Sequence, residues 1–189
     1  MAHVDNNIFI EGLRGNVAKQ IVFRKTRKGT VASRMPKTDP NREPTQGQLE
    51  HRDRFADASD YAQEVLADPE LKALYEAALD PENTLRGTIV RDFFKAPKVR
   101  EVDTDSYKGV VGDVIRIKAK DDFRVIAVDV RILNAAGELL EEGAAIIDPK
   151  SRKKWLYTTT VPNPELAGTV IQVTATDMPG NTGSLDVTL

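Results

Sequence analysis

The spacing of apolar residues changes near residue 98, and this change constrains the fold more than any other feature of the chain. From there to the C-terminus, apolar and polar residues alternate in six stretches: VVGDVIRIKAK, FRVIAVDVRILN, ELLEEGAAII, KKWLYTTTV, GTVIQVTAT and GSLDVTL. A period of two is typical of strands that bury one face. Turn-forming residues such as Asp148-Pro149 and Pro179-Gly180 separate the stretches. With a seventh strand expected near 98–103, residues 98–189 are predicted to form an all-β antiparallel sandwich domain.

Three segments of this region occur in a suggestive order: GDVIRIKAKDDFRVIAVDVRI, then WLYTT, then GTVIQVTATDMPGN. Together they resemble bacterial immunoglobulin-like modules of the fibronectin/adhesin type. In that family a G-D-x-I-x-I-x-A-x-D strand precedes a V-x-V-x-V strand, and an A-T-D-x-x-G-N corner leads into the final strand. The resemblance covers residues 99–189 and implies a seven-stranded immunoglobulin-like sandwich. It implies no single function, since such modules serve as spacers, adhesins, carbohydrate-binding appendages and phage structural parts.

The first half of the chain has a different pattern. Residues 7–35 contain short, partly alternating stretches divided by glycines, which predict a small antiparallel sheet or β-hairpin. Apolar residues at helical spacing predict helices over 46–67, after the cap Asp68-Pro69, and near 82–95, where Pro97 ends the pattern. The chain is therefore expected to be α+β overall, with a β-hairpin and helical domain at 1–97 and the sandwich at 98–189.

Charge is distributed unevenly in this first half. Residues 14–42 carry nine bases and one acid, whereas residues 43–92 carry twelve acids and five bases. One interpretation is that the basic hairpin packs beside acidic helices, within the chain or on a neighbouring copy. The other is that it contacts the phosphates of a nucleic acid, although only Phe23 could stack on a base. The candidate residues for either role are Arg14, Lys19, Arg24, Lys25, Arg27, Lys28 and Arg34.

Acidic residues near the predicted loop ends are candidates for a calcium-binding site. Carboxylate and amide oxygens suit this ion, and sandwich modules often bind it at their ends. The spacing does not match an EF-hand loop, and aspartate is also a common turn former. The sequence therefore favours turns, with calcium as the alternative, for Asp103, Asp105, Asp121, Asp122, Asp177 and Asn181.

Two aromatic residues share one face of a predicted strand, because Trp155 and Tyr157 flank Leu156. We expect them to belong to the core of the sandwich. The alternative is an aromatic platform that recognises a sugar or a protein. Lys150, Arg152, Lys153 and Lys154 precede them as a small basic loop.

Motifs that carry catalysis are missing from the sequence. There is no cysteine, only two histidines, and no G-x-S-x-G segment. Few residues could therefore hold a transition metal, and no nucleophile has a base nearby in the sequence. We expect a protein that is not an enzyme and that carries no cofactor, apart from the calcium alternative.

No stretch approaches the roughly 20 apolar residues of a membrane span. The N-terminal stretch MAHVDNNIFIEGLRGN lacks the long apolar segment of a signal peptide. These features predict a cytoplasmic protein and leave open non-classical export or association with a virion. The leading hypothesis is a structural or binding protein, a subunit of a larger bacterial or phage-like assembly that binds a protein partner or itself. The alternatives are a carbohydrate- or calcium-binding module and a nucleic-acid-binding protein.

Overall fold

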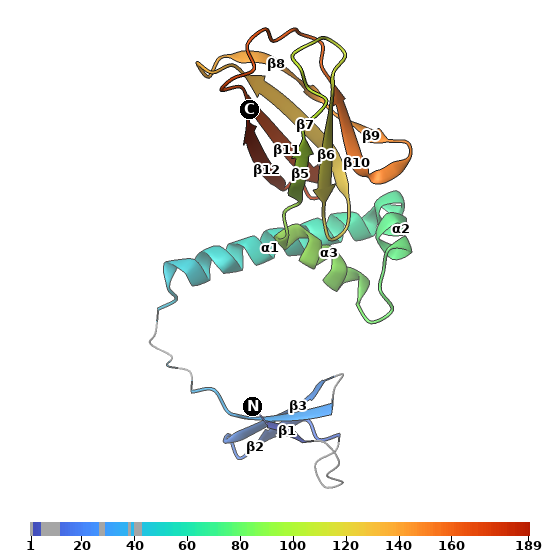
Figure 1. Ribbon diagram of the computed structural model, residues 1–189. Coiled ribbons are helices and arrows are strands. Elements are labelled where there is room, and N and C mark those ends of the chain that lie inside the picture. Colours follow the sequence, from blue (N-terminus) through green and yellow to red (C-terminus); the bar gives the residue numbers. More distant parts are fainter. Residues whose placement is uncertain (1, 5–11, 27–28, 38, 40–42) are drawn as a thin grey trace. The chain divides into compact units, whose positions relative to one another are not determined.

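The computed structural model describes residues 2–4, 12–26, 29–37, 39 and 43–189. The chain separates into two compact units, Met1–Gln46 and Gly47–Leu189, and most of the described elements are labelled in Figure 1. The predicted combination of an N-terminal antiparallel sheet, helices and a C-terminal β region is confirmed.

The first unit contains one antiparallel sheet with the strand order β1-β4-β3-β2. Its longest pairing joins β3 and β4 in register from Ile21↔Arg34 to Thr26↔Gly29. The predicted strand that began at residue 8 lies mostly outside the described residues. The strands are β1 (Ala2–Val4), β2 (Gly15–Val17), β3 (Ile21–Thr26) and β4 (Gly29–Arg34).

Three helices open the second unit, close to the predicted ranges: α1 (Gln46–Ala67), α2 (Pro69–Ala77) and α3 (Leu85–Phe94). The Asp68 carboxylate caps α2 by accepting hydrogen bonds from the backbone N–H of Glu70 and Leu71. Thr84 caps α3 in the same way, with its hydroxyl accepting from the N–H of Gly87. Their shared core consists of Ala62, Val65, Tyr75 and Ile89.

Two four-stranded antiparallel sheets follow, with the orders β5-β6-β10-β9 and β12-β11-β7-β8. Their inward residues alternate with outward polar ones, as on β6, where Ile115, Ile117 and Ala119 are buried. The strands are β5 (Lys98–Asp103), β6 (Val114–Lys120), β7 (Val125–Leu133), β8 (Leu139–Ala144), β9 (Ile146–Asp148), β10 (Ser151–Thr158), β11 (Val170–Asp177) and β12 (Thr182–Thr188).

This region has eight described strands rather than the seven expected, because the predicted strand 138–147 divides into two. The first part, β8, pairs with β7, and the second part, β9, pairs with β10 in the opposite sheet. The buried Ala145 lies at the crossing, and its N–H donates to the Val128 carbonyl at 2.7 Å. Alternation alone did not reveal this change of sheet.

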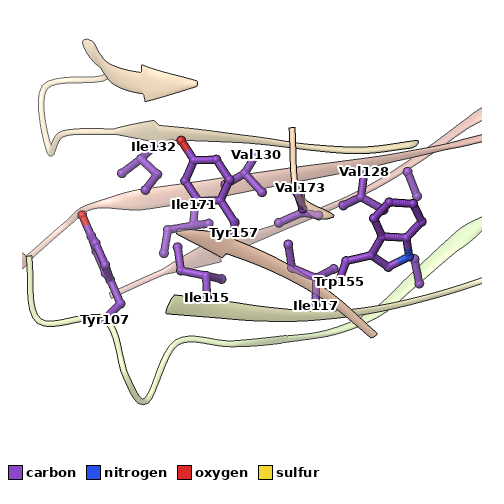
Figure 2. Packing of buried hydrophobic residues seen from close by; sticks show 13 residues of the cluster. Tyr107, Ile115, Ile117, Val128, Val130, Ile132, Trp155, Tyr157, Ile171 and Val173 are labelled. Carbon is purple, nitrogen blue, oxygen red and sulfur yellow. The ribbon is translucent and has the colours of Figure 1, made fainter. Parts of the chain in front are cut away.

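The core of the sandwich lies between the two sheets, as Figure 2 shows. Trp155 and Tyr157 lie opposite Ile117 and Ile115 in one sheet. Val128, Val130 and Ile132 pair with the inward residues of β11 in the other. The cluster of buried residues comprises Tyr107, Ile115, Ile117, Ala119, Val128, Val130, Ile132, Ala145, Trp155, Tyr157, Ile171, Val173 and Ala175.

The helices belong to the same compact unit as the sandwich, Gly47–Leu189. The Tyr75 ring of α2 stacks on Phe123, in the β6–β7 turn, with ring centroids 3.9 Å apart. The Asn181 amide donates to the Phe93 carbonyl at 3.1 Å. Composition along the chain marked the change from helix to strand, but it could not show that the two parts pack together.

Candidate binding groove

A groove of about 1180 Å³ lies beside the β5-β6-β10-β9 sheet, between segments 118–125 and 147–155. Its apolar lining comes from Ala119, Phe123, Val125, Ile147 and Trp155, together with Pro149. Six lining residues are cations and two are acids, so the groove is strongly positive. The cations are Arg100, Lys118, Lys120, Arg124, Lys153 and Lys154, and the acids are Asp121 and Asp148.

Strand geometry explains why these cations gather. On β6 the inward residues are apolar, and the three exposed residues between them are Arg116, Lys118 and Lys120. Because side chains two residues apart share a face, all three bases point outward on one strand. The polar half of this alternation is thus entirely basic.

Like charges lie directly opposite each other on neighbouring strands. Lys118 of β6 pairs with Lys154 of β10, and Lys98 of β5 pairs with Lys120 of β6. Such pairs destabilise an antiparallel sheet, whereas opposite charges at the same positions stabilise it by roughly 0.2–1 kcal/mol. These two pairs do not stabilise the isolated sheet, whereas the opposite-charge pairs Glu101↔Lys118 and Asp103↔Arg116 do.

A large irregularity in β10 forms one wall of the groove. Ser151 pairs with Asp148 and Trp155 pairs with the adjacent Ile147, so residues 152–154 have no partners on β9. Bulges of this kind redirect side chains and are common beside functional sites. This segment without partners on β9 carries Lys153 and Lys154, both in the groove lining.

The two acids of the groove are engaged by the backbone. Asp121 Oδ2 accepts from the N–H of Phe123 and Arg124, and Asp148 Oδ1 accepts from the N–H of Lys150. Among the cations, Lys118 forms an ion pair with Glu101. Within the part of the chain that the structure describes, the other five lining cations have no ion pair: Arg100, Lys120, Arg124, Lys153 and Lys154.

A buried acidic cluster lies behind the turn that lines the groove. The Tyr75 hydroxyl donates to Asp92 Oδ2 at 2.7 Å, and the Tyr61 hydroxyl lies 3.1 Å from that of Tyr75. Asp92 is only 2% exposed, and its Oδ1 has no hydrogen-bond donor among the described residues. Asp121 and Asp177 are close enough to interact electrostatically with it.

Burial raises the pKa of Asp92 to about 7, and the negative charges of Asp121 and Asp177 add to the effect, while the Tyr75 hydrogen bond opposes it. Asp92 can bond to the Asp121 carboxylate only when one of the two is protonated, because two carboxylates have no donor. Burial also raises the pKa of Asp177, against the hydrogen bonds that it accepts from Asn181. The pKa values of Tyr75 and Tyr61 are raised by burial as well.

The six residues proposed for calcium are divided between two regions. Asp103 pairs with Arg116 near the start of β6, and its Oδ1 accepts from the N–H of Asp105. Asp121, Asp122, Asp177 and Asn181 lie beyond the other end of that strand, next to the helices. Asp122 bonds to Lys95, which lowers the pKa of its carboxyl. In residues 2–4, 12–26, 29–37, 39 and 43–189, no group of three or more acids and histidines is arranged to hold a metal ion.

The described cations among these N-terminal candidates, Arg14, Lys19, Arg24, Lys25 and Arg34, are exposed but do not all share one face. In β3, Arg24 and Lys25 are adjacent and therefore point to opposite faces of the sheet. Arg34 shares the face of Lys25, because it pairs with Ile21. Arg14 and Lys19 are exposed outside these strand positions, and Arg27 and Lys28 lie outside the described residues.

Trp155 and Tyr157 belong to the core, 8% and 5% exposed, so they do not form an aromatic surface platform. Both point between the sheets (Figure 2), where the same alternation that places them on one face also buries that face. Only Trp155 reaches the groove lining.

Comparisons with known proteins assign no family. No family model matches the chain, and no curated protein matches it. Among solved structures, the crystal structure of CopC from Methylosinus trichosporium OB3b is similar, with a TM-score of 0.35 and 12% identity, over 48% of this chain and 87% of that one. In the described part of the chain, no helix is long and apolar enough to cross a membrane.

Proposed function

We propose that this protein is a non-enzymatic binding protein, a subunit of a larger assembly, with an immunoglobulin-like sandwich whose groove binds an acidic surface of a protein partner. The strand order supports the fold. With β5 to β12 taken in sequence as strands A, B, C, C′, D, E, F and G, one sheet is A-B-E-D and the other is G-F-C-C′, as in immunoglobulin-type sandwiches.

The observation that carries the proposal is the set of five unpaired cations around a groove with two like-charged strand pairs. Lysines that repel each other in the isolated protein are stabilised when a bound anion neutralises their charges. The apolar lining between the cations suits side chains of a protein partner, since interfaces combine a polar rim with apolar contact.

Aromatic geometry favours a protein over a single-stranded nucleic acid. Base stacking needs exposed ring faces, but Trp155 is 8% exposed and one face of Phe123 is covered by Tyr75. The same burial disfavours a sugar platform at this site.

The test is a double charge reversal, Lys120→Glu with Lys154→Glu, assayed for binding to fluorescent poly-L-glutamate at low and physiological salt. We expect at least about tenfold weaker binding, since both electrostatic attraction and encounter rate fall. We also expect the free energy of unfolding to rise by roughly 0.5–1 kcal/mol, because each new glutamate faces Lys118 or Lys98 across the sheet.

The matched control reverses the same amount of charge elsewhere, with Lys108→Glu and Arg14→Glu, at exposed positions outside the groove lining. This control should bind poly-L-glutamate almost as tightly as the wild type. Equal binding by the groove variant would contradict the proposal, and so would a large loss of its stability, which would mean that the lysines are structural. Tight binding of a single-stranded oligonucleotide that persists at physiological salt and depends on Lys120 and Lys154 would replace the protein partner with nucleic acid.

A further inference from the structure

The longest helix carries an acidic face. Along α1, acids recur at intervals of three and four residues, which places them on one side of the helix. This side is about 130° around the helix from the buried Ala58, Ala62 and Val65. The exposed residues of this acidic face are Glu50, Asp53, Asp57, Asp60 and Glu64.

Most of this acidic face is unpaired within its own chain. Asp53, Asp57, Asp60 and Glu64 form no ion pair with any residue that the structure describes. Of the two arginines on α1, Arg54 lies over the Phe94 ring, 5.2 Å from its centroid. Like charges three and four residues apart weaken a helix by a few tenths of a kcal/mol per pair, so this face, like the groove, is not arranged for the stability of the single chain.

We propose that the acidic face of α1 in one copy of this chain docks against the cationic groove of a second copy. This inference rests on the proposed function and names the protein partner. Sequence alone suggested the N-terminal basic segment as the complement of the acidic helices. The groove is the better complement, because it gathers five unpaired cations, whereas the cations of β3 point to both faces of their sheet.

The dimensions of the two surfaces agree. From Asp53 to Glu64 the helix rises about 16 Å, and a helix with its side chains is roughly 10–12 Å wide. The groove cations Lys118 and Lys120 of β6 lie about 7 Å apart along the strand, and three adjacent strands span about 10 Å. One helix can therefore place carboxylates above Lys120 of β6 and Lys154 of β10, while Lys118 is paired with Glu101 of β5.

Because the two surfaces differ, the contact is head-to-tail. A head-to-tail contact between identical chains builds a ring when its rotation closes and a filament when it does not. This association would suit an assembly subunit, and it would weaken as salt screens the charges.

The test uses sedimentation of three full-length variants at low and high salt. The groove variant carries Lys120→Glu and Lys154→Glu, and the face variant carries Asp57→Lys and Asp60→Lys. The wild type should associate at low salt and dissociate at high salt, and each variant alone should associate at least about tenfold more weakly. An equimolar mixture of the two should associate more tightly than either variant alone, because the acidic face of the groove variant fits the groove of the face variant and the two reversed surfaces also attract each other. The variant with all four changes should associate again, because the charges are exchanged.

The outcomes separate this inference from the proposed function. If the wild type is monomeric at low salt while the groove still binds poly-L-glutamate, the second copy is not the partner and the proposed function stands. Association that both variants retain would also overturn the inference. If the groove binds neither poly-L-glutamate nor a second copy, both proposals fail.

Discussion

Replacing Gly109 with alanine should lower the free energy of unfolding by about 3 kcal/mol or more, whereas the same change at Gly137 should cost about 1–2 kcal/mol. Both glycines have left-handed backbone angles, φ +79° and +82°, so alanine pays the same local strain at each. At Gly109, however, the new Cβ would lie 2.0 Å from the carbonyl oxygen of Asn163, while nothing lies within 4 Å at Gly137. A backbone atom cannot move aside as a side chain can, so overpacking adds to the strain.

The clash would disturb a buried polar network at one end of the sandwich. The N–H of Asn163 donates to the Gly109 carbonyl at 2.9 Å, and its side-chain amide donates to the hydroxyls of Tyr107 and Thr169. Urea unfolding of the two variants and the wild type measures the difference. Equal losses at Gly109 and Gly137 would show that Asn163 can withdraw and that this end of the sandwich is not tightly fixed.

The strands and helices were predictable because their signals are local. Alternation over 98–189 located the strands, and the cap and proline at Asp68-Pro69 located the start of α2. The sheet change at Ala145 was not predictable, because a continuous apolar-polar pattern looks the same whether a strand stays in one sheet or crosses to the other.

The groove depends on pairing between distant strands. The outward run Arg116, Lys118 and Lys120 was visible in the sequence as an alternation whose polar positions are all basic. Its meeting with Lys154 requires the register between β6 and β10, which no local pattern fixes. In the sequence, the basic residues before Trp155 resemble an ordinary solvated loop, whereas Lys153 and Lys154 lie within β10 in the structure.

Asp92 was missed for the same reason. In the segment RDFF it looks like a polar residue on a helix surface, between Arg91 and the aromatic residues. Only the packing of α2 and of the turn at Asp121 against α3 encloses it.

Replacing Asp92 with asparagine should stabilise the protein at pH 8, by up to about 4 kcal/mol, and should change little near pH 4. The carboxyl has its ordinary pKa near 3.8 in the unfolded chain and about 7 in the folded protein. Between these values the folded state holds a proton that the unfolded state has lost, so the contribution of Asp92 to stability falls as pH rises through this window. Above pH 7 the folded protein must bury the ionised carboxylate, which costs 1.36 kcal/mol of stability for each unit by which the pKa is raised.

Asparagine keeps the shape and the bonding of the protonated acid. The asparagine carbonyl can accept the hydrogen bond from the Tyr75 hydroxyl that Asp92 Oδ2 accepts now. The asparagine NH₂ would take the place of the buried Asp92 Oδ1, which has no hydrogen-bond partner among the described residues, and could donate to Asp121. The pKa of Asp177 is also raised, whereas the pKa values of Asp113 and Asp122 are lowered. The pH dependence of unfolding in the wild type therefore combines several carboxyl groups. The measurement is therefore the difference in unfolding free energy between Asp92→Asn and the wild type at each pH from 4 to 8.

A matched variant, Asp122→Asn, removes an exposed acid one residue from Asp121. Its pKa is lowered by the hydrogen bond from Lys95, so the change should weaken stability slightly from pH 8 down to about 4, and this loss should fade only below pH 4. The two variants should thus move stability at pH 8 in opposite directions. A loss of stability in Asp92→Asn at pH 8 would mean that the charged carboxylate is satisfied in the folded protein. The turn at Asp121 and Phe123 would then adjoin an ionised group, and the groove beside it would be less positive than its own residues indicate.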